Sequence, residues 1–131
     1  MPADVDALLS GNLLLSALRV PDQALIKPHL ELKAYERGEA LFEAGDDVSY
    51  ISFPLGQCVA ALVIGLQDGR AVETATVGHE GAIGGVVSQG SLPAFSRAVV
   101  QIPGSVLRIE AAVLQKIKQT SPGMRNLLTR Y

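Results

Sequence analysis

Residues 77–109 read VGHEGAIGGVVSQGSLPAFSRAVVQIPGSVLRI, and this stretch decides the fold. It ends in two apolar runs, 98–102 and 106–109, which only Pro103 and Gly104 separate. Proline fixes φ and glycine accepts a positive φ, so the pair predicts a tight turn. The two short runs on either side of that turn therefore predict a β-hairpin.

The first part of the stretch is rich in glycine, with residues of this type at positions 78, 81, 84, 85 and 90. Glycine lets the backbone take left-handed conformations and lets another group approach closely, which indicates a binding cradle. The same glycines would also turn the corners of a small β-barrel-like roll. Composition alone favours the second interpretation.

Length, charge and cysteine content exclude several classes of protein. With 131 residues the chain forms one domain, large enough to bury roughly two-thirds of its unfolded surface. Its single cysteine, Cys58, excludes an internal disulfide and a multi-cysteine zinc or iron–sulfur site. A formal net charge of −2 without a basic cluster argues against DNA binding by this segment alone.

The chain also lacks the sequence signs of membrane insertion or secretion. Its longest apolar stretch, residues 58–66, is far shorter than the roughly 20 residues that span a bilayer. The N-terminus carries acidic residues where a secretory signal has positive ones. We therefore expect a cytoplasmic protein without membrane contact.

Helices are predicted at the beginning of the chain and strands after them. Asn12 is a suitable N-cap for a helix over 13–18, and a second helix over 23–27 should end at Pro28. From Leu30 the apolar residues alternate, which predicts a half-buried strand over 30–35. Further strands are predicted over 40–42 and 50–53, with turns at 37–39, 45–47 and 54–56.

The longest predicted strand covers residues 57–66. Asp68 and Gly69 suit a two-residue hairpin turn, which would lead into a return strand over 70–77. The outgoing strand is apolar on both faces, so it is either covered on both sides or meets a partner subunit or helix.

After the glycine-rich stretch the pattern becomes helical again. A helix is predicted over 110–119, with Lys116 and Lys118 on its exposed side, and another begins at Pro122 or Met124. Short strands between two helical ends predict a mainly β protein, an antiparallel jelly roll flanked by short N-terminal helices and by C-terminal helices.

Enzymatic chemistry finds little support in the sequence. A cupin-type metal site needs several histidines, but His29 and His79 are the only two and no His-x-His pair occurs. No serine stands in a Gly-x-Ser-x-Gly motif, and Cys58 lies in an apolar strand where it is typical of a core. We expect no catalytic residues, no metal and no cofactor.

Binding is the better-supported class of function. Arg97 begins a strand next to the glycine-rich stretch, and Arg70 follows the Asp-Gly turn. A guanidinium facing a glycine-lined backbone is typical of phosphate recognition, because backbone N–H groups reach the remaining oxygens. The alternative is that both arginines are surface residues paired with Glu73 and Glu80.

The order of these features resembles one known family, the N-terminal sensor domains of Crp/Fnr-type bacterial transcription regulators. The resemblance covers residues 12–131. The motifs that carry it are Lys33-x-Tyr35-x-x-Gly38-Glu39-x-Leu41-Phe42-x-x-Gly45-Asp46, Tyr50-Ile51-x-Phe53-Pro54-x-Gly56, Asp68-Gly69-Arg70 and Val77-Gly78-x-Glu80-Gly81-x-Ile83-Gly84.

The resemblance implies that residues 1–131 are a cyclic-nucleotide-binding-like sensor domain. Residues 12–120 would form the β-roll with its flanking helices, and 122–131 would open the helix through which relatives form homodimers. A small molecule, not identified by the sequence, would be the effector. DNA would be bound only through a downstream helix-turn-helix domain, which is absent from this chain.

In that family a Gly-Glu pair holds the ribose of the cyclic nucleotide and an Arg followed by Ser or Thr holds the phosphate. Gly84 matches the glycine, but Gly85 stands where the glutamate would be. Ala94 stands at the place of the arginine, and Arg97 comes three residues later. The resemblance thus indicates Gly84, Gly85, Ser96 and Arg97 as ligand-binding candidates, and we expect no tight binding of cyclic AMP.

Two hypotheses of different classes remain. The chain is either the sensory domain of a dimeric transcription regulator, which acts by shifting its last helix, or a free-standing, ligand-free oligomerisation module.

Overall fold

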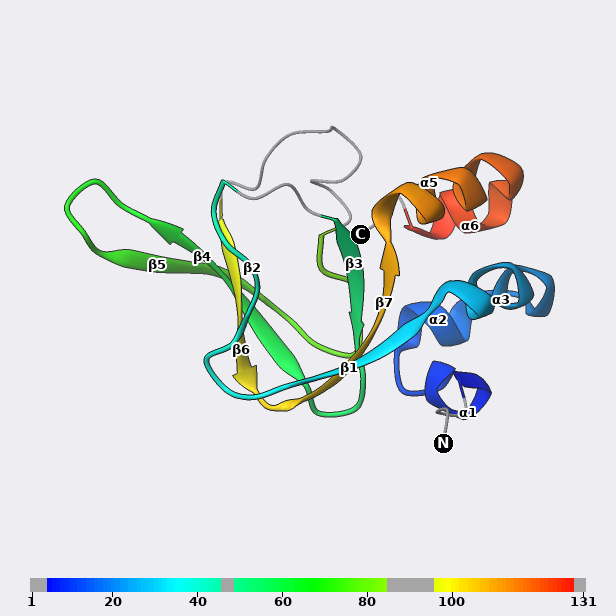
Figure 1. Ribbon diagram of the computed structural model, residues 1–131, viewed down its shortest axis with the longest axis horizontal. Helices are drawn as coiled ribbons and strands as arrows, with labels where there is room; N and C mark the ends of the chain where they lie inside the picture. The colour runs from blue at the N-terminus through cyan, green and yellow to red at the C-terminus, as the bar shows by residue number, and fades with distance from the viewer. Residues whose placement is uncertain (1–4, 46–48, 85–95, 129–131) are drawn as a thin grey trace.

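The computed structural model describes residues 5–45, 49–84 and 96–128, and in them seven strands form two antiparallel sheets (Figure 1). One sheet has the order β1-β7-β3 and the other the order β2-β6-β4-β5. The strands are β1 (Glu31–Tyr35), β2 (Ala40–Phe42), β3 (Tyr50–Pro54), β4 (Val59–Gly65), β5 (Ala71–Val77), β6 (Arg97–Ile102) and β7 (Gly104–Glu110). The predicted antiparallel roll with helices at both ends is confirmed.

The helices from the two ends of the chain gather on one side of the roll, whereas the β4–β5 hairpin extends on the opposite side (Figure 1). They are α1 (Val5–Leu9), α2 (Leu13–Ala17), α3 (Val20–Ile26), the short 3₁₀ helix η1 (Lys27–His29), α5 (Ala111–Thr120) and α6 (Pro122–Leu128). None of them, within the described ranges, has the length and apolar character that a membrane crossing requires.

The N-terminal helices differ from the prediction in two details. A third α-helix, α1, precedes the two that were expected. Pro28 does not end the helical path, because it lies in the first turn of η1, where a missing N–H breaks no helical hydrogen bond.

The predicted hairpin at Pro103-Gly104 is wrong. β6 pairs with β4 and β2, whereas β7 pairs with β1 and β3, so the chain passes from one sheet to the other at this corner. Gly104 is needed for a close approach, since a Cβ at this position would lie 2.7 Å from the Cβ of Cys58. Its φ is not positive.

Residues 66–70 connect β4 to β5, and the pair Leu66–Arg70 encloses a loop of three residues, 67–69, and not the predicted two. The Leu66 N–H donates to the Arg70 carbonyl over 2.7 Å, and the Gly69 N–H donates to the Leu66 carbonyl over 3.1 Å. Gly69 has a φ of 88°. A turn followed by a left-handed glycine is the usual form of a three-residue hairpin loop.

Burial along two of the predicted strands, 30–35 and 57–66, is uneven. In β1 only Tyr35 is buried, and Leu32 is 41% exposed, so the predicted half-burial of this strand is limited to its end. In β4 the consecutive residues Ala60 and Ala61 point to opposite faces and are both buried. The chain itself therefore covers β4 on both sides at its beginning.

Successive side chains of β7 point alternately into two separate hydrophobic cores. Leu107 and Ile109 pack with the helices, in the core that also holds Phe53, Ile26 and Met124. Val106 points the other way and packs in the roll interior with Cys58 and other residues. β7, the central strand of the three-stranded sheet, is thus buried on both faces, and the helices pack on its outer face.

Lys118 is the clearest departure from helical periodicity. It was expected on the exposed side of α5, but it is 8% exposed and faces inward with Leu114 and Ile117. No hydrogen bond or ion pair of its ammonium occurs within the described residues. Burial lowers the pKa of Lys118 below the ordinary 10.5, because desolvation disfavours the charged form.

We predict that Gly104→Ala lowers the free energy of unfolding by about 1–3 kcal/mol, because the new methyl group overlaps the backbone and Cβ of Cys58. Urea denaturation measures the change. Gly65→Ala is the matched control, since Gly65 is also in a strand but a Cβ there meets nothing within 4 Å. Equal effects of the two substitutions would contradict the close approach.

We also predict that Lys118→Met stabilises the fold by about 1 kcal/mol, because it replaces a partly desolvated ammonium without a partner by an apolar group at a buried position. Between the lowered pKa and 10.5 the folded chain binds fewer protons than the unfolded chain, so the Lys118 contribution to stability rises with pH. Urea denaturation across this window should show the rise in the wild type and in the exposed control Lys116→Met. It should be reduced in Lys118→Met, and an unchanged slope there would refute the assignment.

Candidate functional site

The described part of the glycine-rich stretch begins with a compact turn after β5. The Gly81 N–H donates to the Gly78 carbonyl over 3.2 Å, and Gly78 donates its own N–H to Glu80 Oε1 over 3.0 Å. The backbone N–H groups of Gly78 and of Glu80 itself lower the pKa of Glu80, because their hydrogen bonds stabilise the carboxylate. Glu80 therefore serves its own turn and does not pair with Arg70 or Arg97.

The segment then pairs with β3 of the roll through Ile83. The backbones of Ile83 and Ser52 exchange two hydrogen bonds of 2.8 and 3.0 Å, which form an isolated antiparallel β-bridge beside β3. The Ile83 side chain packs in the interior with Ala60 and Ala98. Gly84 follows with a φ of 100°, a backbone conformation that residues other than glycine rarely adopt.

Asn12 fastens this segment to the helices. Its amide nitrogen donates to the carbonyls of Pro54 and Gly81, both over 2.9 Å. Its amide oxygen accepts from the N–H groups of Leu14 and Leu15, over 3.0 and 3.2 Å, as the predicted N-cap of α2. All four hydrogen-bonding positions of a fully buried side chain are thus used.

Two backbone contacts strengthen this junction. The Leu13 N–H donates to the His79 carbonyl over 2.7 Å, and the Gly56 N–H donates to the Gly11 carbonyl over 3.0 Å. His79 takes part through its carbonyl, and its side chain is exposed. The beginning of α2 is therefore attached both to the glycine-rich segment and to the turn after β3.

The ligand-binding candidates lie around the segment 85–95. Gly84 is the last described residue before it, Ser96 and Arg97 are the first after it, and Gly85 lies outside the described residues. No hydrogen bond or ion pair in the described ranges joins Gly84 to Ser96 or Arg97. The structure thus does not test their grouping into one site.

The two arginines have partners other than those considered from the sequence. Arg97 Nε lies 3.1 Å from Glu43 Oε1, and Arg70 Nε lies 2.7 Å from Asp68 Oδ2 in its own turn. Glu73 accepts instead from Gln101 over 2.8 Å. All four side chains of the two ion pairs are at least 45% exposed, so the pairs contribute little to stability.

Arg108 is a charged residue of the roll that sequence reasoning missed. It lies directly opposite Glu31 on one side and Ser52 on the other, in one row that continues to Ile83. Because Val106, two residues away, points into the interior, Arg108 lies on the inner face as well. The signal in the sequence was an arginine within the apolar run 106–109.

The surroundings of the Arg108 guanidinium are partly polar and partly aromatic. Nη2 donates to Glu31 Oε1 over 2.8 Å, and the group stacks 4.1 Å from the centre of the Tyr50 ring. Nε is buried and has no acceptor among the described residues. The side chain is 20% exposed, so the inner face carries a cation that an anionic ligand group could use.

Metal and thiol chemistry find no support in the described part of the chain. No three His, Cys, Asp or Glu side chains in it form a group that could hold a metal ion. Cys58 is buried, and burial raises the pKa of its thiol. It is therefore an uncharged core residue, and it supports the corner at Gly104.

The fold is similar to that of several solved structures. No family model and no curated protein matches the sequence. Among solved structures, the chain is similar to the N-terminal domain of a transcriptional regulator from Streptomyces coelicolor A3(2). The identity is 24% and the TM-score 0.72, over 94% of this chain and 85% of that one.

Two other regulators are similar as well. The Thermus thermophilus Catabolite Activator Protein shares 16% identity with a TM-score of 0.76, over 89% of this chain and 55% of that one. The sensor domain of the transcriptional regulator DNR from Pseudomonas aeruginosa shares 12% identity with a TM-score of 0.77, over 95% and 83%. The chain spans just over half of the activator, and its fold is that of Crp/Fnr-type sensor and cyclic-nucleotide-binding domains.

We predict that Asn12→Asp destabilises the protein by at least about 2 kcal/mol. Aspartate keeps the cap of α2 but cannot donate to Pro54 and Gly81, and it brings a carboxylate against two carbonyl oxygens. Chemical denaturation measures the loss, and Asn12→Ala, which removes both functions, is the comparison. An Asn12→Asp variant as stable as the wild type would show that the two donated hydrogen bonds are unimportant.

Proposed function

We propose that the chain is the effector-sensing and dimerisation domain of a Crp/Fnr-type bacterial transcription regulator, and not an enzyme. The observation that carries this proposal is the fold likeness to sensor domains of transcriptional regulators over about nine-tenths of the chain. The dimer would form through the helix that begins at α6, from residue 122 onward. DNA would be bound by a separate domain.

The effector would bind where the glycine-rich stretch meets the roll, with Gly84, Gly85, Ser96 and Arg97 as contacts. The positive φ of Gly84 supports a backbone shaped for close approach. The Arg97–Glu43 pair is exposed on both sides, so a ligand oxyanion could replace the carboxylate at little cost. Arg108 offers a second cation on the inner face of the roll.

Cyclic AMP is a poor candidate for this effector. Gly85 cannot provide the carboxylate that relatives use for the ribose, and Ala94 cannot provide the guanidinium that they use for the phosphate. A polar ligand that enters a buried site without its charged partners leaves its own polar atoms unpaired. A different small molecule, or none, would then bias the position of α6.

The alternative of a ligand-free oligomerisation module rested on the apolar strand at residues 57–66 and on the terminal helix. Its first half is covered by the chain itself at Ala60 and Ala61, so that part needs no partner. The sensor proposal is therefore preferred.

We predict no heat of binding when micromolar cyclic AMP is added to the protein in a calorimeter. The double substitution Gly85→Glu and Ala94→Arg should gain binding, because it supplies the ribose and phosphate partners. Micromolar binding of cyclic AMP by the unchanged chain would contradict the residue assignment.

The proposed anion contact of Arg97 is tested by the affinity of the Arg97→Ala variant for any effector that is found, with Arg70→Ala as the control.

The regulator role itself is tested on the product of the complete reading frame. A helix-turn-helix domain after Tyr131 and specific retention of promoter DNA would support it. A stop codon after Tyr131 would overturn it in favour of the oligomerisation module.

A further inference from the structure

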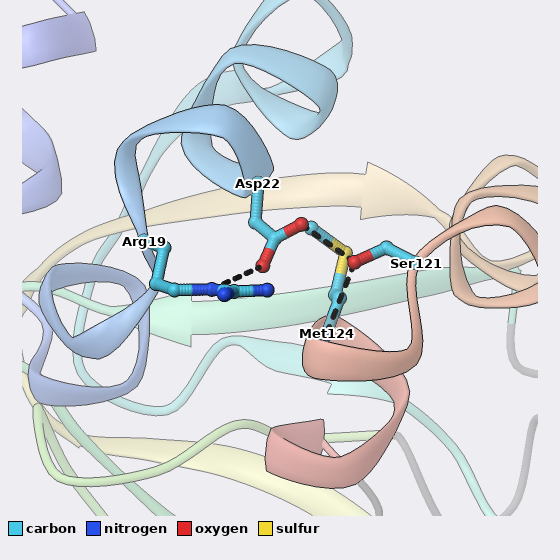
Figure 2. Close-up of polar contacts among 4 residues, drawn as sticks. All are labelled: Arg19, Asp22, Ser121 and Met124. Atoms are coloured by element: carbon cyan, nitrogen blue, oxygen red, sulfur yellow. Dashed lines mark hydrogen bonds and ion pairs between the residues drawn. The ribbon is translucent and has the colours of Figure 1, made fainter.

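A polar cluster joins the two ends of the chain, which are far apart in sequence. Figure 2 shows Asp22 on α3 between Arg19 and Ser121, the residue before α6. The Ser121 hydroxyl donates to Asp22 Oδ1 over 2.5 Å, and Arg19 Nε lies 3.9 Å from Asp22 Oδ2. Asp22 and Ser121 are both 6% exposed, so solvent hardly screens their contact.

The same hydroxyl also begins α6. Ser121 Oγ accepts from the Met124 N–H over 3.2 Å, which is the contact that an N-cap serine makes. We call the three groups, the Asp22 carboxylate, the Ser121 hydroxyl and the Met124 N–H, the clasp. Because one oxygen serves both hydrogen bonds, the first turn of α6 cannot move away from α3 without breaking the hydrogen bond to a carboxylate.

Packing around the clasp leaves little room for adjustment. A Cβ on Gly123 would lie 3.0 Å from Arg19 Nη2 and 3.2 Å from Asp22 Oδ2, so the backbone of α6 lies directly against α3. The Met124 side chain is fully buried in the helix-side core together with Leu15 and Ile26. α6 therefore rests on the N-terminal helices.

The opposite end of those helices is attached to the glycine-rich segment just before Gly84. Asn12 donates to Gly81, and Leu13 donates to His79, at the beginning of α2. Between α2 and α3, the Gln23 side chain donates to the Leu15 carbonyl over 3.1 Å. Directional contacts thus run without a break from the glycine-rich segment through α2 and α3 to α6.

We propose that the N-terminal helices couple the glycine-rich segment to α6, with Asn12 at one end of this connection and the clasp at the other. The direct covalent path from β7 through α5 is the competing connection. As a route for a sensory signal the inference rests on the proposed function, but the coupling itself requires neither an effector nor DNA.

Amide hydrogen exchange of the whole chain, followed by NMR, tests the coupling. Asp22→Asn weakens the clasp and keeps its shape, and the remote reporters are the amides of Gly81 and Ile83. Asn12→Asp weakens the other end, and its remote reporters are the amides of Met124 and Arg125. In each variant we expect exchange at the remote reporters to accelerate about tenfold or more, the scale of a lost hydrogen bond to a charged group.

Two controls separate coupling from general destabilisation. Asp68→Asn breaks a charged contact of the exposed β4–β5 loop and should leave both sets of reporters unchanged. The amides of Leu107 and Ile109 in the central strand report global unfolding, so only acceleration in excess of theirs counts. If Asn12→Asp does not fold, Asn12→Ser keeps the cap and removes the paired donors.

Acceleration confined to the substituted end of the connection in both variants would overturn the proposal, because α6 would then be positioned by β7 and α5 alone. This outcome is independent of the calorimetric and DNA-binding tests. The coupling can fail in a true regulator, and it can hold in a protein that binds no DNA.

Discussion

The structure depends on the requirement that the buried amide of Asn12 satisfy all four of its hydrogen-bonding positions. Two of its partners are the N–H groups of Leu14 and Leu15 in the first turn of α2, and the other two are carbonyls of β3 and of the glycine-rich segment. A buried polar group left unpaired costs more than a paired one contributes, so the three segments meet in one arrangement. A helix end, a strand end and a loop are thereby fixed by one side chain.

The central sheet extends this arrangement across the molecule, because β7 has two different neighbours on its two faces. Leu107 and Ile109 pack against the helices, while Val106 and Arg108 face the roll interior. The residue row through Arg108 and Ser52 ends at Ile83, beside the segment that Asn12 holds. A change at the inner face and a change in the helical layer therefore act on the same few contacts.

The sequence supports the prediction of local structure better than that of partners. The Asn12 cap, the turns at Gly38 and Gly56 and the terminal helices follow from local rules. At Pro103 and Gly104 both the predicted tight turn and the predicted hairpin were wrong, since Gly104 already lies in β7 without a positive φ and turn chemistry does not say which sheet receives the next strand. Lys118 and Arg108 were missed for a related reason, because periodicity assigns charged residues to the surface and only tertiary packing shows them inward.

The C-terminal helices combine contacts of opposite effect. The clasp and the buried Met124 hold α6 against α3, whereas the partial desolvation of the Lys118 ammonium, without a partner in the described residues, disfavours the docking of α5. An element with a large net preference for one position would respond to no effector, because a ligand shifts an equilibrium only by its difference in affinity for the two states. The contacts of opposite effect in α5 and α6 reduce the net preference of these two helices for the docked position. In the sensor proposed above, Lys118 would thus favour a response to an effector, although it lowers the stability of the docked helix.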